Sequence, residues 1–170
     1  MGRAVNLFVS ITRSPEETEK AGEVLGRALE IGDVVLLIGE LGAGKTAFSR
    51  GVARGLGVRD RVTSPTFVLV RNYQGSKELV HADLYRLGDG ALFDLQMLEL
   101  GMPDVVTVIE WGDRAAGSFE YLRPLTIRFI PQNNPDVRVL RYEGDPDAWS
   151  LRLSRAGLEI RTLDWPLPEN

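Results

Sequence analysis

Cysteine is absent from the 170-residue sequence, which excludes disulfide bonds and thiolate metal sites. A reducing compartment is the natural setting for such a chain, so we expect a cytoplasmic protein. Histidine occurs once, at His81, and one histidine cannot supply a cluster of imidazole ligands. A structural or partner-facing role therefore suits His81 better than a catalytic one.

Long apolar runs are also missing. No stretch approaches the roughly 18 apolar residues of a membrane-spanning helix, and residues 1–11 lack the features of a secretory signal. We therefore expect a soluble protein without a membrane partner. Lysine is confined to Lys20, Lys45 and Lys77, and the formal net charge is −4 with a pI near 5.1. This acidic balance argues against a domain that mainly binds a nucleic-acid backbone.

Apolar runs bounded by turn and capping residues predict alternating strands and helices. Predicted strands cover residues 5–11, 34–38, 66–73, 79–81, 105–109, 125–130 and 137–142. The first predicted helix begins at Pro15 and is ended by Gly32. Further predicted helices cover residues 46–56, 91–100 and 148–155. The apolar runs at 34–38 and 105–109 are typical of strands buried on both faces, as in parallel sheets covered by helices.

The segment Gly39–Thr46 reads GELGAGKT and fits the P-loop pattern of two glycines, a lysine and a hydroxyl. Its glycines let successive backbone N–H groups point at a phosphate, and the following helix presents its positive end to the same anion. Lys45 is placed to reach the β- and γ-phosphates, and the Thr46 hydroxyl to ligate Mg²⁺. The loop follows a predicted buried strand and opens a helix, so the sequence predicts nucleotide binding.

A P-loop needs a further acid to hold Mg²⁺, and Glu110 directly follows the predicted strand 105–109. Ligands of open α/β sheets sit at the carboxyl ends of the strands, where Glu110 is expected. A carboxylate oxygen of glutamate can serve a hard cation as well as that of aspartate. The alternative is a solvated carboxylate at a strand end.

Three further segments supply candidate residues around the nucleotide. Asp83 follows a short strand and could orient water or complete the metal shell, although an isolated acid is more often a surface or capping residue. Ser64 and Thr66 lie in the interval where P-loop switches carry a phosphate-sensing loop, or in a plain Ser-Pro turn. Trp111 could lie near the nucleotide or cover the core.

Four segments together resemble the bacterial TsaE family (older name YjeE), the ATPase of tRNA threonylcarbamoyladenosine synthesis. In the family's order they are GELGAGKT from Gly39, SPTFVLV from Ser64, HADLYRL from His81 and VIEWGDR from Val108. They span most of residues 33–114, and the N-terminal strand and helix also fit. The part from about Phe119 matches only in its pattern of strands.

This resemblance implies a P-loop α/β fold with a mixed, mainly parallel central sheet flanked by helices. It implies ATP and Mg²⁺ as ligands, with slow intrinsic hydrolysis. We expect residues 1–144 to form this ATPase domain. Residues 145–170 are expected to form a C-terminal extension that packs on the domain or trails from it.

The resemblance also assigns roles to individual residues. Asp83 and Lys45 are the implied catalytic residues, Thr46 and Glu110 the metal-shell residues, and Ser64 and Thr66 the switch loop. Nucleotide contacts are implied for Gly42, Ala43, Gly44, Lys45, Thr46, Ala47 and Trp111. Many family members carry a second hydroxyl where this chain has Ala47, so any contact from that hydroxyl to the α-phosphate is missing here.

The implied partners are the TsaB and TsaD proteins, which transfer threonylcarbamoyl to adenosine 37 of tRNA, next to the anticodon. The TsaE-like protein does not perform the transfer, and its nucleotide cycle resets the complex between turnovers. We therefore expect tRNA to be contacted only indirectly, through the partners.

Two other functions on a P-loop fold are weighed against this one. A GTPase is expected to carry an Asn-Lys-x-Asp segment, and neither Lys20 nor Lys77 lies in one. A small-molecule kinase needs an arginine-bearing lid, and Arg71, Arg86 and Arg114 form no obvious lid segment. The kinase stays the alternative because a fold alone does not determine function.

Overall fold

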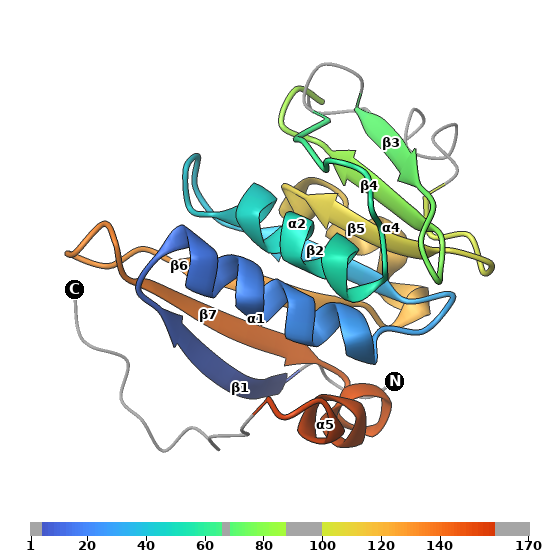
Figure 1. The fold of residues 1–170 in the computed structure, drawn as a ribbon. Coiled ribbons are helices and arrows are strands. Elements are labelled where there is room, and N and C mark those ends of the chain that lie inside the picture. Colours follow the sequence, from blue (N-terminus) through green and yellow to red (C-terminus); the bar gives the residue numbers. More distant parts are fainter. Residues whose placement is uncertain (1–4, 66–68, 88–99, 159–170) are drawn as a thin grey trace.

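The computed structural model describes residues 5–65, 69–87 and 100–158, and one mixed sheet organises this part of the chain (Figure 1). The seven described strands are ordered β1-β7-β6-β2-β5-β4-β3. Their bounds are β1 Val5–Thr12, β2 Val34–Ile38, β3 Val70–Tyr73, β4 Leu79–Asp83, β5 Val106–Glu110, β6 Leu125–Ile130 and β7 Arg138–Gly144.

The centre of the sheet is parallel and its margins are antiparallel. β2 pairs in parallel with β5 and β6, and β4 pairs in parallel with β5. The β6–β7, β1–β7 and β3–β4 pairs are antiparallel. The mixed, centrally parallel α/β sheet expected from the sequence is therefore confirmed.

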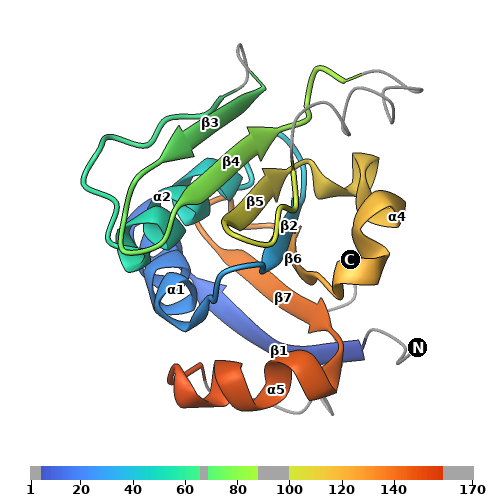
Figure 2. The same cartoon turned by 90° about the vertical axis from the view of Figure 1, so that its right-hand side faces the viewer.

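Helices cover both faces of this sheet. α1 (Pro15–Ala28) and α2 (Lys45–Gly55) lie side by side on one face, and the short α4 (Ala116–Phe119) lies on the other (Figure 2). Single 3₁₀ turns, η1 (Gly112–Arg114) and η2 (Glu120–Leu122), flank α4. None of the helices in the described ranges is long and apolar enough to cross a bilayer.

Two apolar cores result, one on each face of the sheet. Strand β2 serves both, because Val35 and Leu37 join the core under α1 and α2 while Val34 and Leu36 join the opposite core. Such burial on both faces explains the uninterrupted apolar run of this strand. Its parallel neighbour β5 is equally buried, so the edge formed by both strands is held rigidly.

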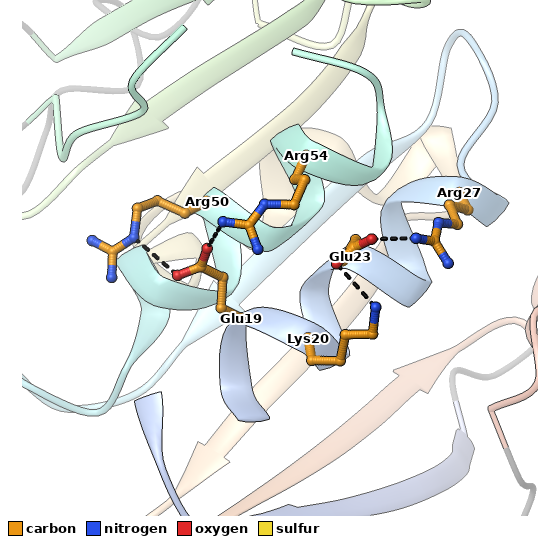
Figure 3. Close-up of polar contacts among 6 residues, drawn as sticks. All are labelled: Glu19, Lys20, Glu23, Arg27, Arg50 and Arg54. Atoms are coloured by element: carbon orange, nitrogen blue, oxygen red, sulfur yellow. Dashed lines mark hydrogen bonds and ion pairs between the residues drawn. The ribbon is translucent and has the colours of Figure 1, made fainter. Parts of the chain in front are cut away.

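The α1–α2 contact is made at unusually short range by glycines. A Cβ built on Gly22 or Gly51 would overlap backbone atoms of the facing helix. On the outer side of the same helix pair, Glu19 bridges Arg50 and Arg54 between the helices (Figure 3). Close backbone approach fixes α2, and thereby the loop that precedes it, against α1.

Helix α5 (Pro146–Arg155) packs beside β1 and α1. Asp145 caps its first turn by accepting a hydrogen bond from the Asp147 N–H, and Trp149 and Leu153 are buried in the core beneath α1 and α2. Arg152 forms an ion pair with Asp33, directly before β2. Residues 145–155 are thereby anchored to the same sheet as the rest of the chain.

Predicted and observed boundaries differ in two instructive places. α1 ends at Ala28, four residues before Gly32, which adopts a positive φ of 90° in the turn to β2. β4 continues to Asp83 instead of stopping at His81. The predicted helix 91–100 and the start of the predicted strand 66–73 lie mainly outside the described residues.

Candidate functional site

The carboxyl ends of the neighbouring parallel strands β2, β5 and β4 meet at one edge of the sheet. In the strand register, Glu110 of β5 stands opposite Asp83 of β4 on one side and Leu37 of β2 on the other. The phosphate-loop pattern Gly39–Thr46 follows β2 directly. Residues chosen from three separate segments of sequence are therefore brought to one place.

The loop has the backbone conformations that its glycines allow. Gly42 and Gly44 adopt positive φ values of 78° and 105°, a region that side-chain-bearing residues rarely occupy. Gly44 is the N-cap of α2, and no side chain caps the first turn of that helix. The N–H groups at this helix end are therefore available for an anion, which the helix dipole also favours.

Lys45 is buried and points back into its own loop. Its Nζ donates to the carbonyl oxygens of Gly39 and Glu40, each at 2.7 Å, and lies 4.1 Å from the centre of the Trp111 ring. Burial lowers the pKa of Lys45, while the carboxylates of Glu110, Asp83 and Asp113 act in the opposite direction. A phosphate would supply the anionic partner that this buried cation favours.

Glu110 is 2% exposed and receives three side-chain contacts. Its Oε2 accepts from the Thr46 hydroxyl at 2.9 Å. Its Oε1 lies 3.0 Å from Ser49 Oγ, which donates to it, and 2.8 Å from His81 Nε2. The solvated-carboxylate interpretation of Glu110 does not describe this environment, because a buried carboxylate needs such partners.

The pair Thr46–Glu110 fits Mg²⁺. Magnesium binds oxygen octahedrally at about 2.0–2.1 Å, which places neighbouring ligand oxygens about 2.9 Å apart. Thr46 Oγ1 and Glu110 Oε2 have this separation, 2.9 Å. Within the described ranges no three or more His, Cys, Asp or Glu side chains form a candidate metal cluster. Magnesium bound with substrate phosphates needs only one or two carboxylates.

Asp83 is buried at the end of β4 beside this pair. Its Oδ2 accepts from the Ser64 hydroxyl at 2.8 Å, and its Oδ1 accepts from the Tyr85 N–H at 2.9 Å. These donors orient the carboxylate, and Ser64 comes from the expected switch loop. The other expected switch residue, Thr66, lies outside the described residues.

Trp111 directly follows Glu110 and is half-buried. Its φ and ψ of 59° and 42° place it in the left-handed region, and its ring lies 5.0 Å from the ring of Tyr85. This backbone turn carries the indole to the mouth of the site, over Lys45. Ala47 lies in α2 and its methyl group is buried.

Three residues at the site were not assigned to it from the sequence: Ser49, His81 and Arg138. Ser49 follows Thr46 by three positions in α2, and His81 precedes Asp83 by two in β4, so periodicity placed both on the site-facing side. Arg138 donates from Nε to the Ala43 carbonyl oxygen at 3.1 Å. No local signal identifies Arg138, because only the pairing of β7 with β1 and β6 brings it to the loop.

Comparison with known proteins places the chain among proteins of one family. The family model for TsaE, described as "Threonylcarbamoyl adenosine biosynthesis protein TsaE", matches residues 12–139. The chain is 42% identical over 131 residues to the tRNA threonylcarbamoyladenosine biosynthesis protein TsaE of Treponema pallidum, covering 76% of this chain and 97% of that protein. It is 40% identical over 136 residues to the protein of the same name from Streptomyces coelicolor, covering 76% and 91%.

A solved structure is similar over nearly the whole chain. The crystal structure of Bacillus subtilis YdiB superposes with a TM-score of 0.69 and 26% sequence identity. The similarity covers 92% of this chain and 96% of YdiB. Fold and sequence comparisons thus lead to the same group of proteins.

Proposed function

This chain belongs to the TsaE family of tRNA threonylcarbamoyladenosine biosynthesis proteins, and on that premise we propose that it binds ATP with Mg²⁺ and hydrolyses it slowly. The observation that carries the proposal is the convergence of Lys45, Thr46 and Glu110 beside a glycine-rich loop at the amino end of α2. A buried cation, uncapped backbone N–H groups and a hydroxyl–carboxylate pair together suit a triphosphate with its metal.

In this proposal the phosphates replace the internal partners of Lys45. Nζ leaves the carbonyl oxygens of Gly39 and Glu40 and donates to the β- and γ-phosphate oxygens. Thr46 and Glu110 would hold Mg²⁺, and the metal would supply positive charge beside the phosphates. The N–H groups of Gly42–Thr46 contact the remaining phosphate oxygens, and Trp111 covers the site.

Asp83 is proposed to orient the attacking water. Water forms a bond to the γ-phosphorus, the bond from that phosphorus to the bridging oxygen breaks, and ADP leaves with the electron pair. Both hydrogens of the water end on the released phosphate. The hydrogen bonds from Ser64 and from the Tyr85 N–H hold the Asp83 carboxylate in one orientation. Ser64 thus links the expected switch loop to the residue that positions water.

We further propose that this ATPase serves the TsaB–TsaD pair. The names of the relatives support a place in threonylcarbamoyladenosine biosynthesis. The transfer of threonylcarbamoyl is assigned to the partners, and ATP hydrolysis here resets the complex between turnovers. With a net charge of −4, this chain is expected to contact tRNA only through the complex.

The experiment that tests this function is ATP hydrolysis by the purified protein, alone and with TsaB and TsaD. Weak release of phosphate that increases in the complex, and that requires Mg²⁺, supports the proposal. Absence of binding to the pair, together with phosphate transfer to a small acceptor, would instead support the alternative, a small-molecule kinase on a P-loop fold.

A further inference from the structure

We infer that His81 is a positioning residue whose Nε2–H, helped by Ser49, fixes one oxygen of the Glu110 carboxylate so that the other faces the magnesium position. This inference rests on the proposed function, because it concerns the same metal site. It assigns a task to the one histidine of the chain and to a serine of α2. Neither side chain is proposed to touch ATP or the metal.

The two oxygens of Glu110 have different surroundings. Oε1 lies 2.8 Å from His81 Nε2 and accepts from Ser49 Oγ at 3.0 Å. Among the described residues, the side-chain partner of Oε2 is the Thr46 hydroxyl of the phosphate loop. A carboxylate can rotate about its last bond, so donors on one oxygen decide which oxygen is presented to the loop. The metal-facing oxygen is therefore Oε2.

The hydrogen-bond network assigns the tautomer of His81. Glu110 Oε1 as a carboxylate oxygen accepts only, so the hydrogen of the contact belongs to Nε2. His81 is fully buried, and its Nδ1 has no partner among the described residues. With the hydrogen on Nε2, Nδ1 is an acceptor. The opposite tautomer would leave a buried N–H unpaired and would face two lone pairs toward each other.

His81 is the more committed of the two donors. Ser49 Oγ lies 3.0 Å from Glu110 Oε1 and also 3.0 Å from the Lys45 carbonyl oxygen, and one hydroxyl has one hydrogen to share between them. Within the described part of the chain, the Nε2–H of His81 has Glu110 Oε1 as its single acceptor. Removal of His81 should therefore disturb the carboxylate more than removal of the Ser49 hydroxyl.

Rigid strands make this arrangement possible. His81 and Asp83 are two residues apart on β4 and point to the same side, while Glu110 ends the neighbouring strand β5. His81 lies one step deeper in the sheet than Asp83. His81 therefore contacts Glu110 from the interior of the sheet, and the carboxyl edge beside Asp83 and Glu110 stays open to substrate.

The test compares His81→Leu, which removes the donor, with His81→Gln, whose side-chain amide can place a donor near the position of Nε2. Isothermal titration measures ATP affinity in EDTA and at increasing Mg²⁺ concentrations, with Mg²⁺ as the only metal. For His81→Leu we expect the Mg²⁺ concentration that gives half of the Mg²⁺-dependent gain in ATP affinity to rise about 10-fold. The ATP affinity measured in EDTA should stay unchanged. His81→Gln should return to within about 3-fold of the original protein.

Ser49→Ala provides a second, milder variant, for which we expect a rise of about 3-fold in the same Mg²⁺ concentration. An unchanged Mg²⁺ requirement in folded His81→Leu overturns the inference, as does a His81→Gln variant as defective as His81→Leu. If His81→Leu does not fold, Ser49→Ala decides, and an unchanged requirement there overturns it. If Mg²⁺ has no effect on ATP binding by the unmodified protein, the proposed function itself is contradicted.

Discussion

The outer face of the α1–α2 pair and the carboxyl edge of the sheet both gather glutamates with donors, but in different surroundings. On the helix face, Glu19 meets Arg50 and Arg54, whose side chains are 42% and 60% exposed (Figure 3). At the sheet edge, Glu110 is 2% exposed and meets hydroxyl and imidazole groups, with a buried lysine nearby. The first set is screened by water and the second is not.

This difference separates what stabilises the fold from what the fold is used for. Exposed ion pairs contribute about 0–1 kcal/mol each, so the helix pair is held mainly by the apolar core beneath it and by its close glycine contact. Burial of Lys45, Asp83 and Glu110 costs free energy that a phosphate and a metal can offset. Changes at the edge should therefore alter binding and turnover, and changes at the helix pair should alter unfolding.

The largest effect is expected for Lys45→Ala, which should weaken ATP binding about 100- to 10,000-fold. Hydrogen bonds to charged groups contribute about 1.5–3 kcal/mol each, and Lys45 is proposed to make two of them. Isothermal titration with ATP and Mg²⁺ measures the loss. Lys20→Ala is the matched control, because it removes an exposed lysine of the helix face. Equal affinities in the two variants would abolish the contrast between the regions.

Asp83→Ala should lower ATP turnover about 100- to 1,000-fold, the range for loss of a group that positions or activates water. ATP affinity should change less than about 3-fold, because Asp83 is not proposed to hold phosphate. Phosphate release in the presence of the partner proteins measures this. Asp104→Ala, an exposed acid before the amino end of β5, removes the same charge away from the site and should leave turnover unchanged. Normal turnover in Asp83→Ala would refute its assigned role.

The phosphate loop and Glu110, at the carboxyl edge of the sheet, were predictable from the sequence for physical reasons. A glycine-rich loop between a buried strand and a helix has few other uses, so Gly39–Thr46 could be recognised locally. Glu110 followed from the rule that ligands lie at the carboxyl ends of parallel strands. The structure puts its carboxylate within hydrogen-bond distance of Thr46, 64 positions away.

The buried contact of His81 with Glu110, farther inside the sheet, was not predicted. The predicted strand 79–81 stops at His81, whereas β4 continues through Asp83. Polar residues can continue a buried strand when each finds a partner, as His81 does on Glu110. Those partners come from other segments of the chain. Strand periodicity therefore shows which residues face the site, but it does not show which of them contact one another.

Gly51→Ala should destabilise the protein by about 2 kcal/mol. A Cβ at this position would overlap the backbone oxygen of Glu19, and overpacking of this kind costs about 1–3 kcal/mol or more. The higher helix propensity of alanine returns only about 1 kcal/mol. Urea unfolding measures the difference, with Gly117→Ala as control, since nothing lies within 4 Å of a Cβ there. Equal losses in both variants would show that backbone approach at α1–α2 is not the cause.

The smallest effect on stability is expected from the ion pairs between α1 and α2. Glu19→Gln and Arg54→Gln, alone and combined, form a double-mutant cycle across α1 and α2. The Arg54 side chain is 60% exposed, so the coupling free energy should stay below about 1 kcal/mol. It should shrink further in 1 M NaCl, where screening acts over about 3 Å. A salt-insensitive coupling above about 2 kcal/mol would mean that this bridge, and not the glycine contact, holds the helices together. In that case an ion pair with an exposed arginine would contribute as much as the buried contacts of Glu110, and burial would no longer distinguish the two regions.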